Sequence, residues 1–153
     1  MRAAGAGIGG AADAFHYMYQ PLNGDGSITA HVVSIDGQNP FAGLMIRQSL
    51  DPSSANVALG LTPSGLSLQS RADTGGDTTT GGSDPAATAG YWIRLVRQGN
   101  VFTAFDSVDG VTWTQVGDPI VVDMTSNVYI GLALTGNDDT QLATAVFDNV
   151  VVA

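Results

Sequence analysis

The side chains that could carry chemistry in this sequence are mostly aspartates. The 153-residue chain has fourteen Asp but no Glu, Lys or Cys, and only two His. Most of the aspartates lie in predicted turns. Only Asp13, Asp106, Asp123 and Asp148 fall near strand positions, and no two of these share an obvious pairing. Retaining glycoside hydrolysis needs two carboxyl groups ~5 Å apart. We therefore expect that the protein is not an enzyme.

Two acidic turns are candidates for metal binding. Asn23, Asp25 and Gly26 look like half of an oxygen-rich calcium loop, and Asp138 and Asp139 are adjacent carboxylates. Calcium takes about six to eight oxygen ligands, and neither turn has the spacing of a complete loop. Turn geometry explains both clusters without an ion, so we expect no cofactor, with calcium as the alternative. The lack of cysteine excludes disulfides and Cys-ligated zinc.

The overall charge restricts the partners. Five Arg against fourteen Asp give a formal net charge of -9, and the pI is near 4.1. Nucleic acids and anionic membranes bind basic surfaces, so neither is an expected partner. No apolar run approaches the ~18 residues of a membrane span.

The elements that must position these side chains are strands. Good helix formers such as Lys and Glu are absent, whereas Val and Thr occur fifteen and fourteen times. Apolar and polar residues alternate with a period of two, and Asp109-Gly110 between two such runs is a strong hairpin signal. The predicted strands are Phe15–Tyr19, Ser27–Ile35, Phe41–Ser49, Asn56–Thr62, Leu66–Arg71, Tyr91–Gln98, Val101–Ser107, Val111–Val116, Ile120–Met124, Val128–Thr135 and Leu142–Val152.

Residues 72–90 differ from the rest of the chain. They are rich in Gly, Thr and Asp and lack core residues, so we expect a long loop, with a short edge strand at Thr78–Thr80 as the alternative. Short strands separated by turn signals, with no convincing helix, predict one all-β domain over residues 1–153, a sandwich or a barrel.

Five stretches carry a family resemblance. They are Phe15–Gly26 (FHYMYQPLNGDG), Gly43–Ser49 (GLMIRQS), Tyr91–Arg97 (YWIRLVR), Ser107–Gly117 (SVDGVTWTQVG) and Ala145–Val150 (AVFDNV). Together they resemble the concanavalin A-like jelly-roll modules of the DUF1349-like type, found in secreted bacterial multidomain proteins and often beside glycoside hydrolases. The resemblance spans about residues 3–152. It implies a two-sheet antiparallel β-sandwich with no significant helix.

The chain departs from the family pattern at its start. Gly5–Gly10 contains glycines where relatives often have an acid and a tryptophan, and Pro40-Phe41 replaces the usual Pro-Trp. Family members also tend to have one or two additional strands upstream. Their absence would leave a sheet edge open, to which another chain could pair.

The resemblance implies weak, shallow carbohydrate recognition, in which flat aromatic rings stack on sugars and planar polar groups bond hydroxyls. Strand alternation predicts that Phe15, Tyr17, Tyr19 and Phe147 belong to the core. We expect Trp113 to pack across its hairpin. Arg47 and Arg71 are expected to face outward, and pairing with Asp side chains is their alternative role. The predicted ligand-binding residues are Arg47, Arg71, Trp92, Phe41, His16 and Gln69.

These expectations define a non-catalytic polysaccharide- or glycan-binding, lectin-like module of a secreted or cell-surface bacterial protein. The alternative is a structural, self-assembling surface, adhesin, filament or coat subunit, forming homo-oligomers through the open sheet edge. Met1–Gly10 lacks the apolar core of a signal peptide. Since we expect an extracellular or cell-surface location, we also expect this chain to be a processed or excised domain.

Overall fold

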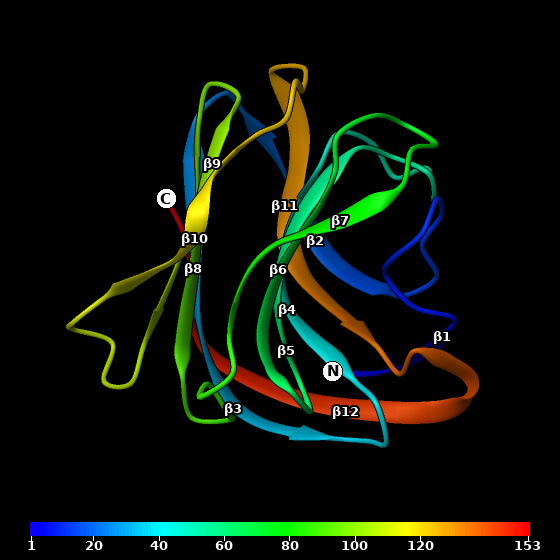
Figure 1. The fold of residues 1–153 in the computed structure, drawn as a ribbon, viewed down its shortest axis with the longest axis vertical. Helices are drawn as coiled ribbons and strands as arrows, with labels where there is room; N and C mark the ends of the chain where they lie inside the picture. The colour runs from blue at the N-terminus through cyan, green and yellow to red at the C-terminus, as the bar shows by residue number, and fades with distance from the viewer.

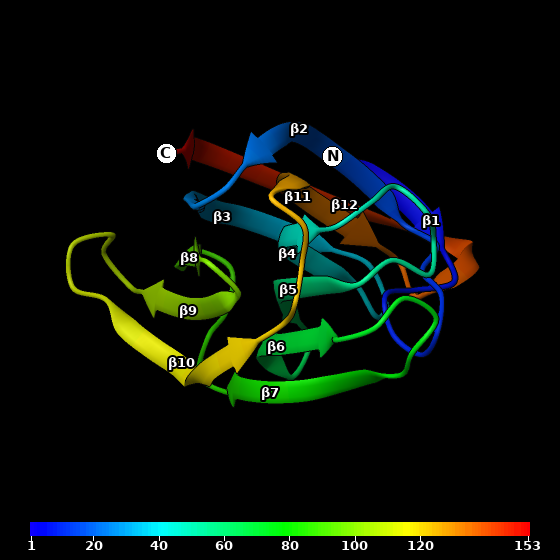
Figure 2. The ribbon, with the colours of Figure 1, turned by 90° about the horizontal axis from the view of Figure 1, so that it is seen from above.

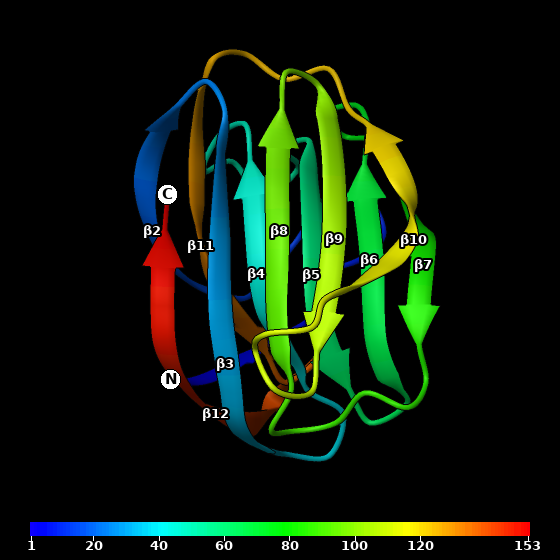
Figure 3. The ribbon, with the colours of Figure 1, turned by 90° about the vertical axis from the view of Figure 1, so that its left-hand side faces the viewer.

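A computed structural model describes all residues from 1 to 153 as two packed β-sheets without a helix (Figure 1). No helix is therefore present that is long and apolar enough to span a membrane. All strand pairs are antiparallel, and the two layers face each other (Figure 3). The prediction of an all-β, two-sheet antiparallel sandwich is confirmed.

Each sheet has six strands. Sheet 1 has the order β1 (Arg2–Gly5), β12 (Asp138–Val152), β3 (Gly26–Asp36), β8 (Trp92–Gln98), β9 (Val101–Ser107) and β10 (Thr114–Val121). Sheet 2 has the order β2 (His16–Asn23), β11 (Asn127–Thr135), β4 (Phe41–Arg47), β5 (Asn56–Thr62), β6 (Gly65–Arg71) and β7 (Thr78–Asp84).

The main core lies between the two sheets. Alternating residues such as Val32 and Ile93 of sheet 1 meet Leu44 and Leu59 of sheet 2, all fully buried. Fully burying such an aliphatic side chain contributes roughly 1.5–3 kcal/mol. Apolar residues therefore recur at every second position of the sequence, because inward side chains pack between the sheets and the alternate ones face outward.

The outer face of sheet 2 is partly covered by a segment of the chain itself. Residues 6–15, between β1 and β2, pass along the outside of this sheet (Figure 2). Ile8 from the segment packs with Phe41, Met45, Ala58 and Ala133 in a second apolar cluster. Almost every residue of β4 and β5 is therefore buried, on both faces of the sheet.

Several predicted boundaries were wrong. The region expected as a loop contains the seven-residue strand β7, so the alternative edge strand is confirmed and extends further than Thr80. The predicted strands Val111–Val116 and Ile120–Met124 are replaced by the single strand β10, whose register shifts between Val116 and Ile120. Strand β1 was not predicted, because four residues with two small alanines produce no clear alternation.

Candidate functional site

A buried polar cluster lies on the outer face of sheet 2, under the segment 6–15. Asp13 from this segment accepts hydrogen bonds from Arg47 Nη1 at 3.0 Å and from Arg71 Nη1 and Nη2 at 2.9 and 2.7 Å. Asn56 Nδ2 also approaches Asp13 Oδ2, at 3.5 Å. Arg47 and Arg71 are only 1% and 0% exposed. The expectation that both arginines face solvent was wrong, and the alternative that they pair with an aspartate is confirmed.

The same arginines also bind main-chain carbonyls of the neighbouring loops. Arg47 donates to the carbonyl oxygens of Ser49 and Asp51, at 2.8 and 2.6 Å. Arg71 donates to those of Gly10 and Ser54, at 2.9 and 3.0 Å. The cluster therefore fixes the loop 48–54 and the segment 6–15 against the sheet, and these two pieces of chain border the open part of the face.

An aromatic row begins beside this cluster and extends toward solvent. The ring centroids of Phe15 and Tyr17 are 5.5 Å apart, and those of Tyr17 and Tyr19 are stacked at 5.2 Å. Tyr129 of β11 meets Tyr19 edge to face at 5.2 Å. Aromatic pairs prefer these offset and edge-to-face arrangements, which hold the rings in fixed orientations.

The row becomes more exposed along its length. Tyr17 is half-buried and donates its hydroxyl to the carbonyl of Met45 at 2.9 Å. Burial raises the pKa of this phenol, although the nearby Arg47 acts in the opposite direction, so the hydroxyl remains a donor. Tyr19 is 46% exposed. The prediction that Tyr19 belongs to the core was therefore wrong, because no part of the segment 6–15 covers that end of β2.

Two hollows flank the exposed part of the row, and both are lined by Leu50, which is 47% exposed. We call them together the tyrosine groove. The hollow of about 270 Å³ is lined by Asp13, Ala14, Phe15, Tyr17, Tyr19, Arg47, Leu50 and Pro52. The hollow of about 520 Å³ is lined by Pro21, Leu22, Asn23, Gln48, Ser49, Leu50, Asn127, Val128 and Tyr129. The groove combines aromatic rings with three side-chain amides, from Asn23, Gln48 and Asn127.

The other predicted ligand residues lie elsewhere. Phe41 is 2% exposed because the segment 6–15 covers it, so its expected exposure was wrong. Gln69 is half-buried on the same outer face, at the register of Ala58. His16 is exposed, on the opposite face of β2 from Tyr17. The structure thus brings Arg47, Arg71, Phe41 and Gln69 to one face of sheet 2 but leaves His16 outside it.

Trp92 lies on the outer face of sheet 1. Its indole stacks on His31 with centroids 4.8 Å apart, and His31 Nδ1 is 2.7 Å from Asp148 Oδ1. In the same sheet, the guanidinium of Arg94 lies 4.1 Å from the centroid of the Trp113 ring. Both tryptophans are thus half-buried by their neighbours, and no hollow lies beside them. The expected packing role of Trp113 agrees with this contact.

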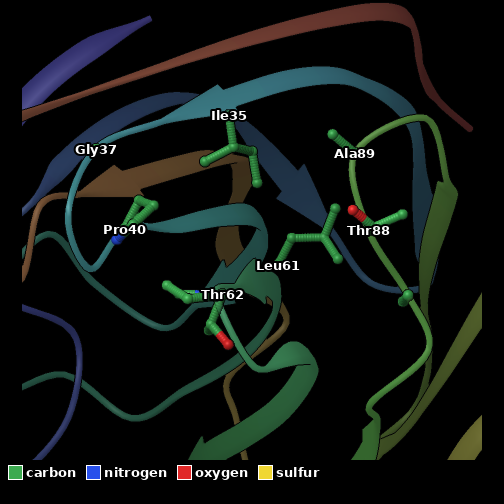
Figure 4. A pocket seen from close by; sticks show the side chains of 9 residues that line it. Ile35, Gly37, Pro40, Leu61, Thr62, Thr88 and Ala89 are labelled. Carbon is green, nitrogen blue, oxygen red and sulfur yellow. The ribbon is translucent and has the colours of Figure 1, made fainter.

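A third hollow, of about 240 Å³, lies at one end of the sandwich (Figure 4). Ile35, Pro40 and Leu61 surround it, together with hydroxyls such as that of Thr62. That hydroxyl already donates to the carbonyl of Gly65 at 3.0 Å. The hollow has no charged or amide side chain in its lining, so it lacks the polar groups that orient a ligand. The tyrosine groove is therefore the better candidate.

Sequence reasoning missed the residues that line the groove. Tyr129, Gln48, Leu50 and Asn127 were not singled out, and Tyr19 was assigned to the core. One signal was present in the sequence, because Phe15, just before β2, alternates with Tyr17 and Tyr19 on it. Two of the aspartates considered for calcium accept main-chain N–H groups: Asp25 that of Gly99 at 2.7 Å, and Asp138 that of Thr140 at 2.8 Å.

Comparisons with known proteins give only structural likenesses. A scan of protein-family models gives no match, and no curated protein sequence matches the chain. A functionally unknown protein from Saccharomyces cerevisiae has a TM-score of 0.69 at 15% identity, over 100% of this chain and 85% of that one. The carbohydrate-binding module CBM66 from Bacillus subtilis has a TM-score of 0.57 at 14% identity, over 92% and 81% of the two chains.

A longer enzyme contains a similar sandwich. The xylan β-1,4-xylosidase from Bacillus halodurans C-125 has a TM-score of 0.61 at 15% identity, over 88% of this chain but only 32% of that chain. Identities this low define the fold alone. The structure is a concanavalin A-like sandwich.

Proposed function

We propose that this chain is a lectin-like carbohydrate-binding module that holds a glycan in the tyrosine groove without cleaving it. The observation that carries the proposal is the fixed pair of Tyr19 and Tyr129, which lies between two hollows on the partly covered outer face of sheet 2. The likeness to CBM66, described as a carbohydrate-binding module, supports it at the level of the fold.

The groove contains the two kinds of group that sugar recognition needs. Tyrosine faces are apolar and pack against the C–H face of a pyranose, while planar amides donate to and accept from its hydroxyls. Gln48 is already oriented, since its Oε1 accepts the N–H of Thr125 at 3.2 Å. Asp13 and Arg47 are the only charged residues that line the groove, and both are buried in an ion pair, so the groove presents no free charge and suits a neutral sugar.

We also propose that the module is of the DUF1349-like type and works outside a bacterial cell, within a larger secreted or surface protein. The five sequence stretches described above support this assignment. The xylosidase offers a parallel, because its matching sandwich is a third of a longer chain. The absence of glutamate supports a role in binding, because the carboxylate pairs of glycosidases are often glutamates.

Replacing Tyr19 with alanine tests the proposal. The Tyr19→Ala variant should fold, because this side chain is 46% exposed, and should weaken glycan retention about tenfold, or about 1.4 kcal/mol. Retention is measured by pull-down on insoluble polysaccharides and by a glycan array. His16→Ala is the matched control, since His16 is exposed on the opposite face of the same strand.

Two results would contradict the proposal. If no glycan is retained, or if Tyr19→Ala and His16→Ala bind like the unmodified protein, the groove does not hold a sugar. Sugar release from a glycan panel that one Asp→Asn substitution abolishes would instead make the protein an enzyme.

A specific observation also favours self-assembly as a second candidate function. Strand β2 is the edge of sheet 2, and Met18 on it is 57% exposed. Val150 and Val151 of β12 are 43% and 56% exposed, and Val150 and Met18 line the same hollow of about 160 Å³. A second copy that pairs with β2 would cover this apolar edge.

Sedimentation should then show dimers that Met18→Asp disrupts, whereas a monomer at all concentrations excludes this candidate.

A further inference from the structure

Two carboxyl groups, those of Asp84 and Asp106, line one hollow of the sandwich that has no Arg, Lys or His in its lining. Asp84 is the last residue of β7 in sheet 2, and Asp106 is the next to last of β9 in sheet 1. Their side chains line the same hollow between the two sheets. Asp84 was predicted to lie in a turn and was not considered beside Asp106, whereas the structure places it at the end of a strand.

Asp106 is a buried acid with an unsatisfied oxygen. The residue is 4% exposed, and its Oδ2 has no hydrogen-bond partner. An unpaired buried carboxylate is costly, since desolvation penalises the charge. Two facing carboxylates are both acceptors, so the pair requires either a shared proton or a cation between its oxygens.

The surroundings of the pair contain oxygen donors and space. Asp84 and Asp106 line a hollow of about 280 Å³ with hydroxyl-bearing side chains and no Arg, Lys or His; the remaining lining residues are Tyr91, Ser107, Val108, Asp109, Thr112 and Thr114. The third carboxylate there is already used, because Asp109 accepts the N–H groups of Val111 and Thr112, at 2.8 and 2.9 Å. Asp84 Oδ1 also accepts the N–H of Ala86, at 3.0 Å, so the oxygens left for a ligand are Asp84 Oδ2 and the unpartnered Oδ2 of Asp106.

We propose that Asp84 and Asp106 form a binding site for a divalent cation of the size of calcium. The donor set is entirely oxygen, and the hollow leaves room for water molecules that complete the coordination shell. Calcium accepts irregular shells of oxygen ligands, whereas magnesium demands a near-octahedral one and releases its water reluctantly. The ion links the two sheets, because the two carboxylates come from different layers.

The proton is the competitor of this ion. Burial first, and then the hydrogen bond and charge of Asp84, raise the pKa of Asp106 to about 7. Calcium needs both carboxylates in their charged form, so it competes with protons and binds less well in acid. The titratable groups that face the pair are Asp109 and the phenol of Tyr91.

Calorimetric titration of the chelator-treated protein with calcium chloride, and thermal unfolding with and without calcium, test the site. We expect one ion per chain and a rise in Tm of roughly 5–10 °C at a calcium concentration a hundred times the Kd. Asp106→Asn and Asp84→Asn should each abolish both effects. Asp139→Asn removes the same charge from an exposed position near the start of β12 and should keep them.

Three outcomes would overturn the proposal. The first is no calcium binding to the unmodified protein, which assigns the pair to a shared proton. The second is binding that Asp106→Asn and Asp84→Asn leave unchanged, which places the ion elsewhere. The third is equal loss in Asp139→Asn, which makes the effect one of net charge. Glycan binding by the tyrosine groove is independent of all three.

Discussion

Asp13 is the residue on which the buried polar cluster depends. Its carboxylate is the only acidic group bonded to Arg47 and Arg71, and both ion pairs are fully buried. A buried ion pair adds little net stability, but removal of one partner leaves an uncompensated charge in the interior. Here two guanidinium groups share one carboxylate. Loss of Asp13 therefore leaves both buried arginines without an acidic partner, and we expect a large loss of stability.

The Asp13→Asn substitution should therefore lower the free energy of unfolding by about 3–5 kcal/mol. Denaturant unfolding measures this change. Asp139→Asn, at an exposed position near the start of β12, is the matched control and should stay within about 0.5 kcal/mol of the unmodified protein. Equal stability of the two variants would mean that water or main-chain groups compensate the arginines.

The strands were predictable from the sequence because the inner faces of both sheets follow a period of two. The cover of sheet 2 was not predictable. The covering segment, residues 6–15, is rich in glycine and has no apolar periodicity. Its contact with Phe41 also depends on Gly60, which is distant in the sequence, because a Cβ at Gly60 would lie 2.4 Å from the ring of Phe41. The absence of a side chain at Gly60 lets Phe41 lie flat on the sheet beneath Ile8.

The candidate site was only partly predictable for the same reason. Alternation assigned Arg47 to an outward face and Tyr19, wrongly, to the core, and it does not reveal which part of a sheet face another segment covers. Arg47 lies on the interior strand β4 and is buried, whereas Tyr19 lies on the edge strand β2 and is 46% exposed. The sequence therefore identified the correct face through Arg47, Arg71 and Gln69, whereas the exposed rings were assigned to the core.

The pH dependence of the free energy of unfolding has two opposing contributions, because some aspartates have a lowered pKa in the folded protein and one has a raised pKa. Hydrogen bonds from turn N–H groups and hydroxyls lower the pKa of Asp51, Asp109 and Asp138, and the hydrogen bond to His31 lowers that of Asp148. Groups with a lowered folded-state pKa stabilise the fold above their unfolded value, and this contribution is lost as the pH falls below about 4. Acid therefore destabilises the protein through its turns.

Asp106 acts in the opposite direction, since its pKa is raised from 3.8 to about 7. The folded chain holds this proton more tightly than the unfolded chain, so stability falls as the pH rises from about 4 to about 7. In the presence of chelator, the free energy of unfolding should therefore peak near pH 4–5 and decline on both sides. Denaturant unfolding across this pH range measures the curve.

Asp106→Asn separates the two sides of that curve, because it removes the buried titration and leaves the turn aspartates unchanged. The neutral-side decline should flatten, while the acid-side loss persists. Calcium should produce the same flattening in the unmodified protein, since an ion between Asp84 and Asp106 replaces the proton whose loss causes the decline. A neutral-side slope that neither Asp106→Asn nor calcium alters would assign the decline to repulsion within a chain of net charge -9. In that case added salt, which screens surface charges, should remove the slope.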